Sequence, residues 1–180
     1  MSPLVGHGCL ARVGRVSLSV GAATDRLVVL AQQSTSGVTV NGEPMVAWDG
    51  WPTSLDFGMF IIGLSQPPGD LNEPDPAITQ AQHWAGLGQM RVDEDYLIPC
   101  CIDARGLGTQ KEARDIAISV FDTFGGLFVA DLTLAGALKS PGMAEVQGIT
   151  HNQLPVGTAS ERAYRHLISF GVHCTNRTTY

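Results

Sequence analysis

Apolar residues in the first third of the chain follow a helical pattern that begins after an irregular segment. Residues 1–15 contain three glycines and a proline and show little periodicity, which predicts an irregular arm. From residue 17, apolar positions recur every three or four residues until residues 34–37 close the pattern. Despite the interruption at Gly21, the sequence predicts a helix here, with its buried stripe formed by Val20, Ala23, Leu27, Leu30 and Ala31.

Short strands are predicted after this helix. Residues 38–40 and 45–48 flank an Asn41-Gly42 pair, and Asn-Gly readily takes the positive φ angles of a type I′ turn. These two segments therefore predict a small hairpin. Residues 57–64 are apolar on both faces, which favours a short strand in the middle of a sheet.

The next segment, residues 65–76, contains four prolines, one glycine and three acidic residues. It lacks the apolar groups needed to offset the entropy of ordering, so we expect an exposed loop. Connections of this length often have a contact function. Asp70, Glu73 and Asp75 are therefore candidate contacts for a protein partner.

A second, larger hairpin is predicted where residues 77–84 and 91–103 flank Gly86-Leu87-Gly88. Pro99 cannot donate a ladder hydrogen bond, so we expect its strand to lie at a sheet edge or to bulge there. Residues of one parity in the second arm are apolar and predict a core face: Val92, Tyr96, Ile98, Cys100 and Ile102. Residues of the other parity predict a face toward solvent or a partner: Arg91, Asp93, Asp95 and Asp103.

The last third of the chain predicts a capped helix followed by two strands. Thr109 and Glu112 have the spacing of a capping box, and an apolar stripe then continues to Leu127. Residues 144–151 and 162–175 predict two strands around a turn at 154–160. The whole pattern predicts an α+β fold, with two main helices packed on an antiparallel or mixed sheet, in which residues 16–180 form a single domain.

Composition narrows the classes of function. The chain has 180 residues, of which 44% are hydrophobic and 16% charged, as in an ordinary folded domain. A formal net charge of −6 without a basic run argues against sequence-specific nucleic-acid binding. The longest strongly apolar run, residues 57–64, is far shorter than the roughly 20 residues of a membrane-spanning helix. We therefore expect no membrane partner, and the four cysteines predict reduced thiols in a cytoplasmic product.

Candidate chemistry is sparse. Residues 106–111 (Gly-Leu-Gly-Thr-Gln-Lys) precede a helix and could hold a phosphate, but they lack the rest of a Walker or dinucleotide motif. Cys100 and Cys101 are neighbours on a strand and point to opposite faces, which disfavours a shared metal site. No residue around any cysteine identifies a reactive thiol paired with a histidine. We predict no catalytic residue, no metal site and no cofactor.

The remaining candidates are surfaces. Asp93, Glu94 and Asp95 could form a paired-carboxylate site, but alternation along the strand favours solvated charge. Trp84, beside the glycine turn, is either a residue at the edge of the core or an anchor for a neighbouring subunit. On the second interpretation, the protein interface comprises Trp84, Leu87, Arg91, Asp93 and Asp95, together with the acidic residues of the 65–76 loop.

The chain resembles the tail terminator proteins of long-tailed bacteriophages, particularly those of phages that infect actinobacteria. The resemblance covers roughly residues 45–175 and is carried by dispersed structural signatures. These are residues 82–88 (Gln-His-Trp-Ala-Gly-Leu-Gly), 96–100 (Tyr-Leu-Ile-Pro-Cys), the helix from Glu112 that ends near 130–134 (Ala-Asp-Leu-Thr-Leu), and 168–174 (Ile-Ser-Phe-Gly-Val-His-Cys).

The resemblance implies an α+β subunit that assembles into a ring, usually a hexamer. Such a ring stops growth of the tail tube and presents the surface on which the head connector docks. The expected partners are therefore other copies of the chain, the tail tube protein and a head-tail connector or head-closure protein. The expected location is the tail or neck of a virion assembled in the host cytoplasm. The alternatives are another neck or tail component, such as a head-closure or tube protein, and an enzyme with a dispersed Cys-His site.

Overall fold

The structure, a computed structural model, has the predicted α+β class and forms a single compact domain. Its two α-helices are α1 (Ser19–Thr35) and α2 (Gln110–Val129). The strands are β1 (Thr39–Val40), β2 (Glu43–Pro44), β3 (Val46–Asp49), β4 (Gly58–Ile62), β5 (Thr79–Trp84), β6 (Arg91–Gly106), β7 (Met143–Val156) and β8 (Ala163–Thr179). The structure describes residues 19–54, 56–66, 78–84, 91–106, 108–156 and 163–179. The predicted arm, residues 1–15, lies outside these ranges.

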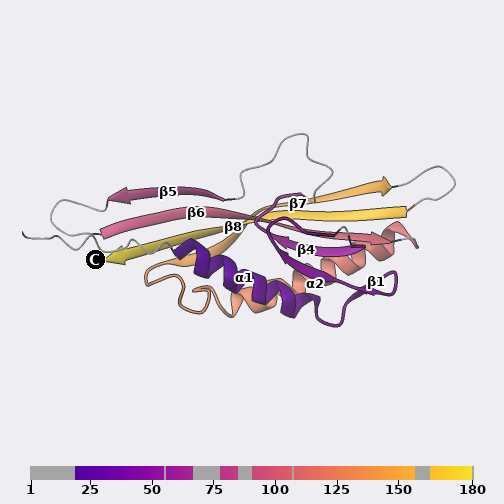
Figure 1. The fold of residues 1–180 in the computed structure, drawn as a ribbon, viewed down its shortest axis with the longest axis horizontal. Helices are drawn as coiled ribbons and strands as arrows, with labels where there is room; N and C mark the ends of the chain where they lie inside the picture. Colours follow the sequence, from indigo (N-terminus) through magenta and orange to yellow (C-terminus); the bar gives the residue numbers. More distant parts are fainter. Residues whose placement is uncertain are drawn as a thin grey trace, which may run out of the picture.

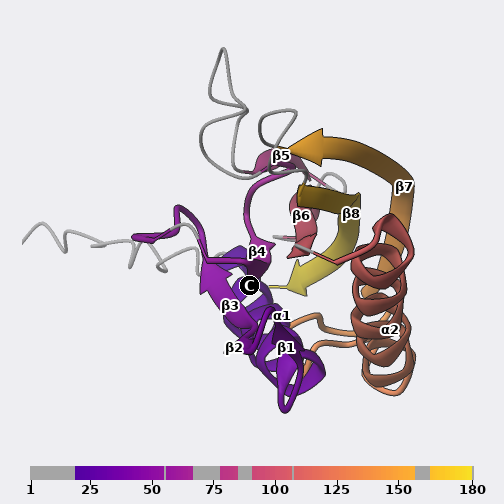
Figure 2. The same ribbon diagram turned by 90° about the vertical axis from the view of Figure 1, so that its right-hand side faces the viewer.

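One six-stranded sheet organises the molecule, in the order β3-β4-β6-β8-β7, with β5 also paired to β6. All pairs are antiparallel except β3 with β4. The two longest strands, β6 and β8, pair along the whole of β6 (Figure 1). Both helices lie on the same face of the sheet, which curves around them (Figure 2). We call this the helix face and the opposite side the outer face.

The two helices form where the sequence predicts them. In α1, Ala23, Leu27 and Leu30 are buried, as the helical spacing requires. At the start of α2, the Thr109 side chain accepts a hydrogen bond from the Glu112 amide at 3.2 Å, which confirms the predicted N-cap. The Arg26 guanidinium binds the Asp131 carboxylate at 2.7 Å and ties α1 to the segment that follows α2.

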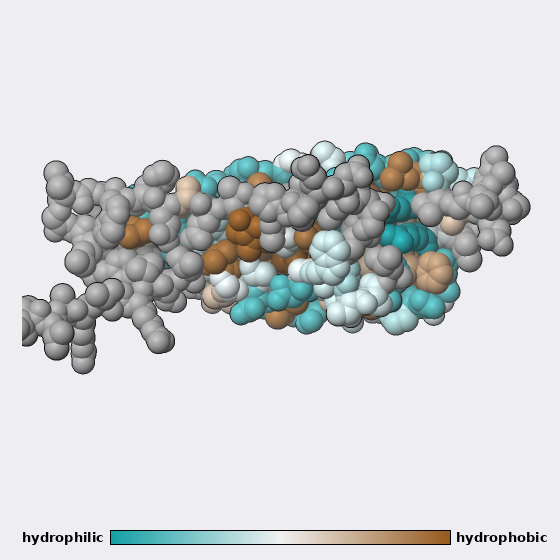
Figure 3. Space-filling view, turned by 45° about the horizontal axis from the view of Figure 1, so that its top comes forward, coloured by the Kyte–Doolittle hydropathy of each residue, from teal (hydrophilic) through white to brown (hydrophobic). Residues whose placement is uncertain are grey.

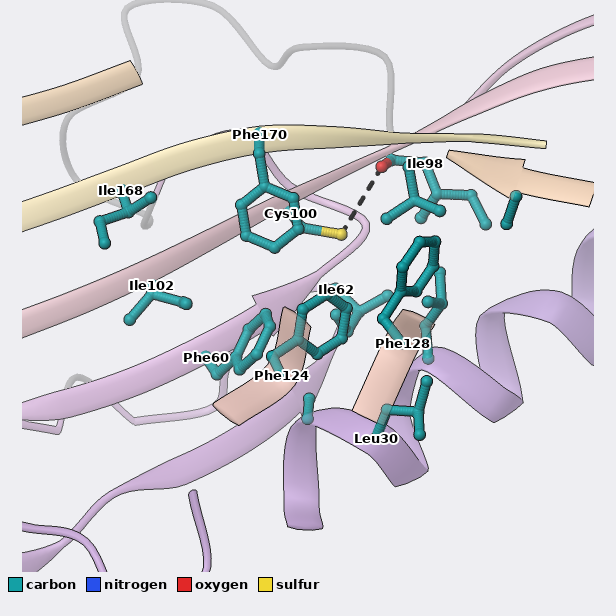
Figure 4. Close-up of a cluster of buried hydrophobic side chains, with 14 of the residues drawn as sticks. Leu30, Phe60, Ile62, Ile98, Cys100, Ile102, Phe124, Phe128, Ile168 and Phe170 are labelled. Atoms are coloured by element: carbon teal, nitrogen blue, oxygen red, sulfur yellow. Dashed lines mark hydrogen bonds between the residues drawn. The ribbon is translucent and has the colours of Figure 1, made fainter. Parts of the chain in front are cut away.

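The main core fills the space between the helices and the sheet. Phe60 of β4 and Phe170 of β8 meet Phe124 of α2 with ring centroids 5.1 and 5.7 Å apart (Figure 4). The apolar parity predicted for the second hairpin arm is confirmed, since Val92, Tyr96, Ile98, Cys100 and Ile102 are all buried. This core holds both helices against the sheet and leaves the outer face as a separate surface.

Strand β6 is central, so the prediction of a sheet edge at Pro99 is wrong. Pro99 pairs with Gly171 of β8, and on the other side it lies between the end of the β5 ladder at Leu97 and the start of the β4 ladder at Cys100. Its carbonyl accepts from the Gly63 amide at 2.7 Å, so its nitrogen points to the β4 side rather than to β8. The missing donor therefore falls where β6 changes partners, and the ladder with β8 loses no hydrogen bond.

The predicted small hairpin exists, but its second arm is shorter than expected. Asn41 and Gly42 have φ angles of 54° and 80°, and they connect β1 to β2. Strand β3, predicted as part of that hairpin, instead pairs in parallel with β4 at the edge of the large sheet. Sequence alternation alone does not distinguish these partners, because β3 has the same length and pattern in either arrangement.

Two strand predictions are confirmed, the first with narrower bounds than predicted and the second with strands that extend further. Strand β4 is buried along its whole length, as its apolar faces predict. Strands β7 and β8 form the predicted C-terminal hairpin, and an irregularity between Gln147 and Thr150 shifts their register. Gly148 has a φ angle of 62° there, which only glycine adopts readily. The bulge lets β7 continue to Val156.

Part of the outer face is buried, which corrects the prediction that Asp103 faces solvent or a partner. Met59, Ile61, Leu64, Cys101 and Leu167 form a second, smaller apolar cluster. Next to it, Asp103 is 0% exposed, and its two carboxylate oxygens accept from Nε of Arg165 at 2.7 Å and Nε of Arg105 at 2.9 Å. Strand parity identified the face correctly, but the assumption that this face is solvated fails here.

Candidate interaction surface

The two predicted aspartates lie on the outer face near one end of the sheet. Two pairs of an aspartate with a basic side chain, across β6 and β8, define what we call the charged face: Asp93 with Arg177 and Asp95 with His173. The Asp93 carboxylate accepts from Arg177 Nε at 2.6 Å and from Nη2 at 2.9 Å, and this bidentate contact raises the pKa of Arg177. Asp95 lies 2.8 Å from Nε2 of His173. The charged face is thus ordered and partly exposed.

The strands that hold this face run beyond the helices. Figure 1 shows the ends of β5, β6 and β8 side by side, past the start of α1. A shallow cavity of about 320 Å³ opens beside the charged face, between β6, β8 and the start of β7. It is lined by Asp93, Asp95, Pro141, Gly142, Thr175 and Arg177, among others. This end of the sheet therefore offers a partner both charged side chains and a shallow cavity.

Glu94 is separated from its two acidic neighbours, because it points to the helix face and is 1% exposed. Its Oε2 accepts from the Ser19 amide at 3.3 Å, from Ser19 Oγ at 2.5 Å and from Asn176 Nδ2 at 3.1 Å. A carboxylate at the first residue of α1 complements the positive end of the helix dipole. Glu94 therefore holds α1 to the sheet and does not form a paired-carboxylate site with Asp93 and Asp95.

The other predicted interface residues are only partly described. Trp84 and Arg91 are placed by their backbones, as the last residue of β5 and the first of β6. Leu87, Asp70, Glu73 and Asp75 lie outside the described residues. The structure brings Trp84, Arg91, Asp93 and Asp95 to the same end of the sheet, since Trp84 pairs with Val92 and His83 with Asp93.

The three described cysteines are buried free thiols. Burial raises the pKa of Cys100 and Cys101, and it raises the pKa of Cys174 to about 12. Cys100 directs its Sγ toward the Ile98 carbonyl, 3.6 Å away (Figure 4). A thiol with a raised pKa is a poor nucleophile, so these positions offer no reactive cysteine.

Two histidines meet elsewhere, between β7 and β8. Nδ1 of His151 lies 3.3 Å from Nε2 of His166. His166 is buried, which lowers its pKa, and the nearby charges of His151 and Arg114 lower it further. Among the residues that the structure describes, no group of three or more His, Cys, Asp or Glu side chains could hold a metal ion.

The glycine segment before α2 does not favour a phosphate. The carboxylate of Glu112 lies against Gly108, where a phosphate would approach the helix N-terminus. Lys111, the cation of that segment, binds Asp115 at 2.6 Å. An acidic side chain at the helix start and a lysine directed elsewhere both oppose anion binding.

An apolar groove between α2 and β7 was missed in the sequence. It has a volume of about 390 Å³, and we call it the β7 groove. Its walls include Phe121, Gly125 and Val129 of α2 and Met143, Glu145 and Ile149 of β7. The signal in the sequence was weak, because Met143 and Ile149 lie on one strand but on either side of a register shift at Gly148 that alternation does not reveal.

No helix in the described part of the chain is long and apolar enough to span a membrane. Figure 3, in which the top of Figure 1 comes forward, shows apolar residues gathered near the middle and hydrophilic residues to their right. The chain matches no model of a known protein family. It also has no match among curated proteins.

Proposed function

We propose that this chain is a tail terminator protein of a long-tailed bacteriophage. In this proposal, copies of the chain form a ring, with six as the expected number, on the end of the tail tube. The ring stops addition of tube subunits and offers a surface to the head connector. The charged face at the projecting end of the sheet is the observation that carries the proposal.

Two features of that end support a protein contact. Its strands are rigid, because β6 is paired on both sides there, with β5 and with β8. Its charges are held in defined positions by the Asp93–Arg177 and Asp95–His173 pairs. Ordered charges at a surface set the orientation of a partner and suppress wrong partners more than they add affinity. The described cysteines, in contrast, are buried thiols with raised pKa values and offer no reactive nucleophile.

The ring requires two different surfaces on each copy. Head-to-tail contacts that close by rotation give a ring, whereas identical self-complementary patches give a dimer. Among the described strands, β7 on one side of the sheet and β3 and β5 on the other have an edge without a strand partner. Since β6 is central, the edge surface once expected at Pro99 belongs to these strands instead.

Deletion of the gene from the phage tests the proposal most directly. We expect filled heads without attached tails, together with tails or polytubes of abnormal length, because tube growth then lacks its stop. Electron microscopy of the lysate, with the intact gene supplied in trans as the control, measures both. Normal tails joined to heads would reject the proposal, and normal-length tails that fail to join would favour a head-closure protein.

A charge reversal tests the charged face. Asp95→Lys should reduce the yield of joined particles in complementation, while Asp122→Lys, an exposed change on α2, should not. Melting temperature and circular dichroism serve as controls for folding. Equal yields from the two variants would remove the charged face from the docking surface.

A further inference from the structure

We propose that residues 1–18 bind in the β7 groove of the same chain and cover the outer edge of β7. The inference concerns the free subunit and does not depend on the ring. The inference rests on three observations. The β7 groove is apolar and uncovered, residues 1–18 join the described chain close to one end of it, and the groove and this segment carry opposite charges.

The β7 groove leaves large apolar side chains exposed. Val129, Met143 and Ile149 are 70%, 50% and 47% exposed, and Glu145 supplies the charge in the groove wall. The Ala144 amide donates to the Leu132 carbonyl, but beyond it no strand in the described ranges pairs with the outer edge of β7. Native proteins cover long apolar edge strands, because an open edge pairs with other chains.

The segment enters the described structure beside the groove. Ser19 binds Glu94 through its amide and its hydroxyl, and Asn176 binds the same carboxylate from the next strand. Gly142 lies against Thr175 and Asn176, and Met143, the next residue, begins the groove wall. Eighteen residues precede Ser19. Fully extended at roughly 3.3 Å each, they reach about 60 Å, which is many times the spacing of about 5 Å between neighbouring strands.

Charge and composition match the groove to this segment. Residues 1–18 contain Arg12 and Arg15 and no acidic residue, which leaves a formal charge of −8 on the rest of a chain whose total is −6. Glu145 in the groove wall is acidic, and so is the exposed Asp122, which follows the wall residue Phe121 in the sequence of α2. The segment also carries apolar side chains to fill the groove, among them Leu4, Val5, Leu10, Val13 and Val16. An extended segment that adds to a strand edge combines main-chain hydrogen bonds with such side-chain contacts.

Photo-crosslinking of the full-length chain tests this assignment. The photoreactive amino acid p-benzoylphenylalanine replaces Ile149 in one variant and Leu154 in the other. Both positions lie on β7 and are similarly exposed, at 47% and 45%, but Leu154 is not part of the groove wall. The variants are irradiated at low concentration as a mixture of light and heavy isotope-labelled protein, and the crosslinked peptides are identified by mass spectrometry.

We expect the Ile149 probe to crosslink to residues 1–18 within one isotope label, roughly tenfold more often than the Leu154 probe. Peptides that join two labels would place a second copy in the groove and overturn the proposal. So would crosslinks from Ile149 to other segments only, an absence of crosslinks, or equal yields from the two probes. These results are obtained on dilute protein, so failure of ring assembly leaves them unchanged.

A charge exchange in the same crosslinking experiment gives a second measurement. Arg12→Glu with Arg15→Glu should lower the Ile149 crosslink severalfold, and adding Glu145→Arg should restore much of it. Circular dichroism of each variant checks that the probe stays on a folded domain. An unchanged crosslink in the double variant, or no recovery in the triple variant, would overturn the charge match on which the proposal rests.

Discussion

Replacement of Asp103 by Ala should destabilise the protein far more than replacement of Asp93. Both aspartates lie on β6, face the outer side and accept a hydrogen bond from the Nε of an arginine on β8, at 2.7 and 2.6 Å. They differ in burial, since Asp103 and Arg165 are 0% and 5% exposed while Asp93 and Arg177 are open to water. The pair of variants therefore compares a buried and an exposed example of the same aspartate–arginine contact.

The expected loss follows from the charge left behind. Asp103→Ala removes the carboxylate from the buried Arg165, and breaking a buried pair in this way costs about 3–5 kcal/mol. Arg105 and Arg165 are also directly opposite each other in the ladder, so the same change leaves two like charges adjacent. For a domain of this size, that loss corresponds to a melting temperature lower by about 6–20 °C. Asp93→Ala should shift the melting temperature little, because water screens the exposed pair.

Urea unfolding followed by circular dichroism measures both free energies, and a double variant tests the cause. Asp103→Ala combined with Arg165→Met removes both buried charges and should recover most of the loss, since apolar side chains often replace a buried pair without cost. A loss below about 1 kcal/mol for Asp103→Ala, in the range of surface pairs, would refute the reasoning. No recovery in the double variant would show that the loss arises from packing rather than charge.

Three further predictions concern single positions. Burial lowers the pKa of His166 below its usual value near 6.5, so below about pH 6.5 the unfolded chain binds more protons than the folded chain. The free energy of unfolding should therefore fall as the pH drops below about 6.5, by at most about 1.4 kcal/mol per pH unit. In urea titrations, His166→Gln should abolish that part of the pH dependence. Gly142→Ala should destabilise by more than about 1 kcal/mol in urea unfolding, because its Cβ would lie 2.7 Å or less from two backbone carbonyls, whereas Gly126→Ala, with open space in α2, should stabilise by about 0.5–1 kcal/mol. Because its pKa is raised to about 12, Cys174 should resist alkylation at pH 8 in the folded protein and react after unfolding; equal rates by mass spectrometry would contradict this.

Local patterns predicted the elements well. The Thr109 cap, the buried stripe of α1 and the parity of β6 depend on residues close in sequence, and the structure confirms them. Partner choice was harder. The position of Pro99 depends on where β4 begins and β5 ends, and nothing near Pro99 in the sequence encodes either boundary.

Burial on the outer face was also unpredictable from alternation. Asp103 and Asp95 have the same parity on one strand, yet one is buried beside a second apolar cluster and the other is exposed. The difference comes from Met59, Leu64 and Leu167, which belong to other elements. The interaction surface was predicted in part, since the sequence placed Asp93 and Asp95 outward but gave no sign of the salt-bridge partners on β8.

The long ladder between β6 and β8 has a mechanical consequence. All 16 residues of β6 have a partner in β8, and the strands run in opposite directions. A pull along the strand axis loads these hydrogen bonds together in shear, whereas a pull across the sheet opens them one after another. Tension between the two ends of the sheet is therefore shared by the whole ladder.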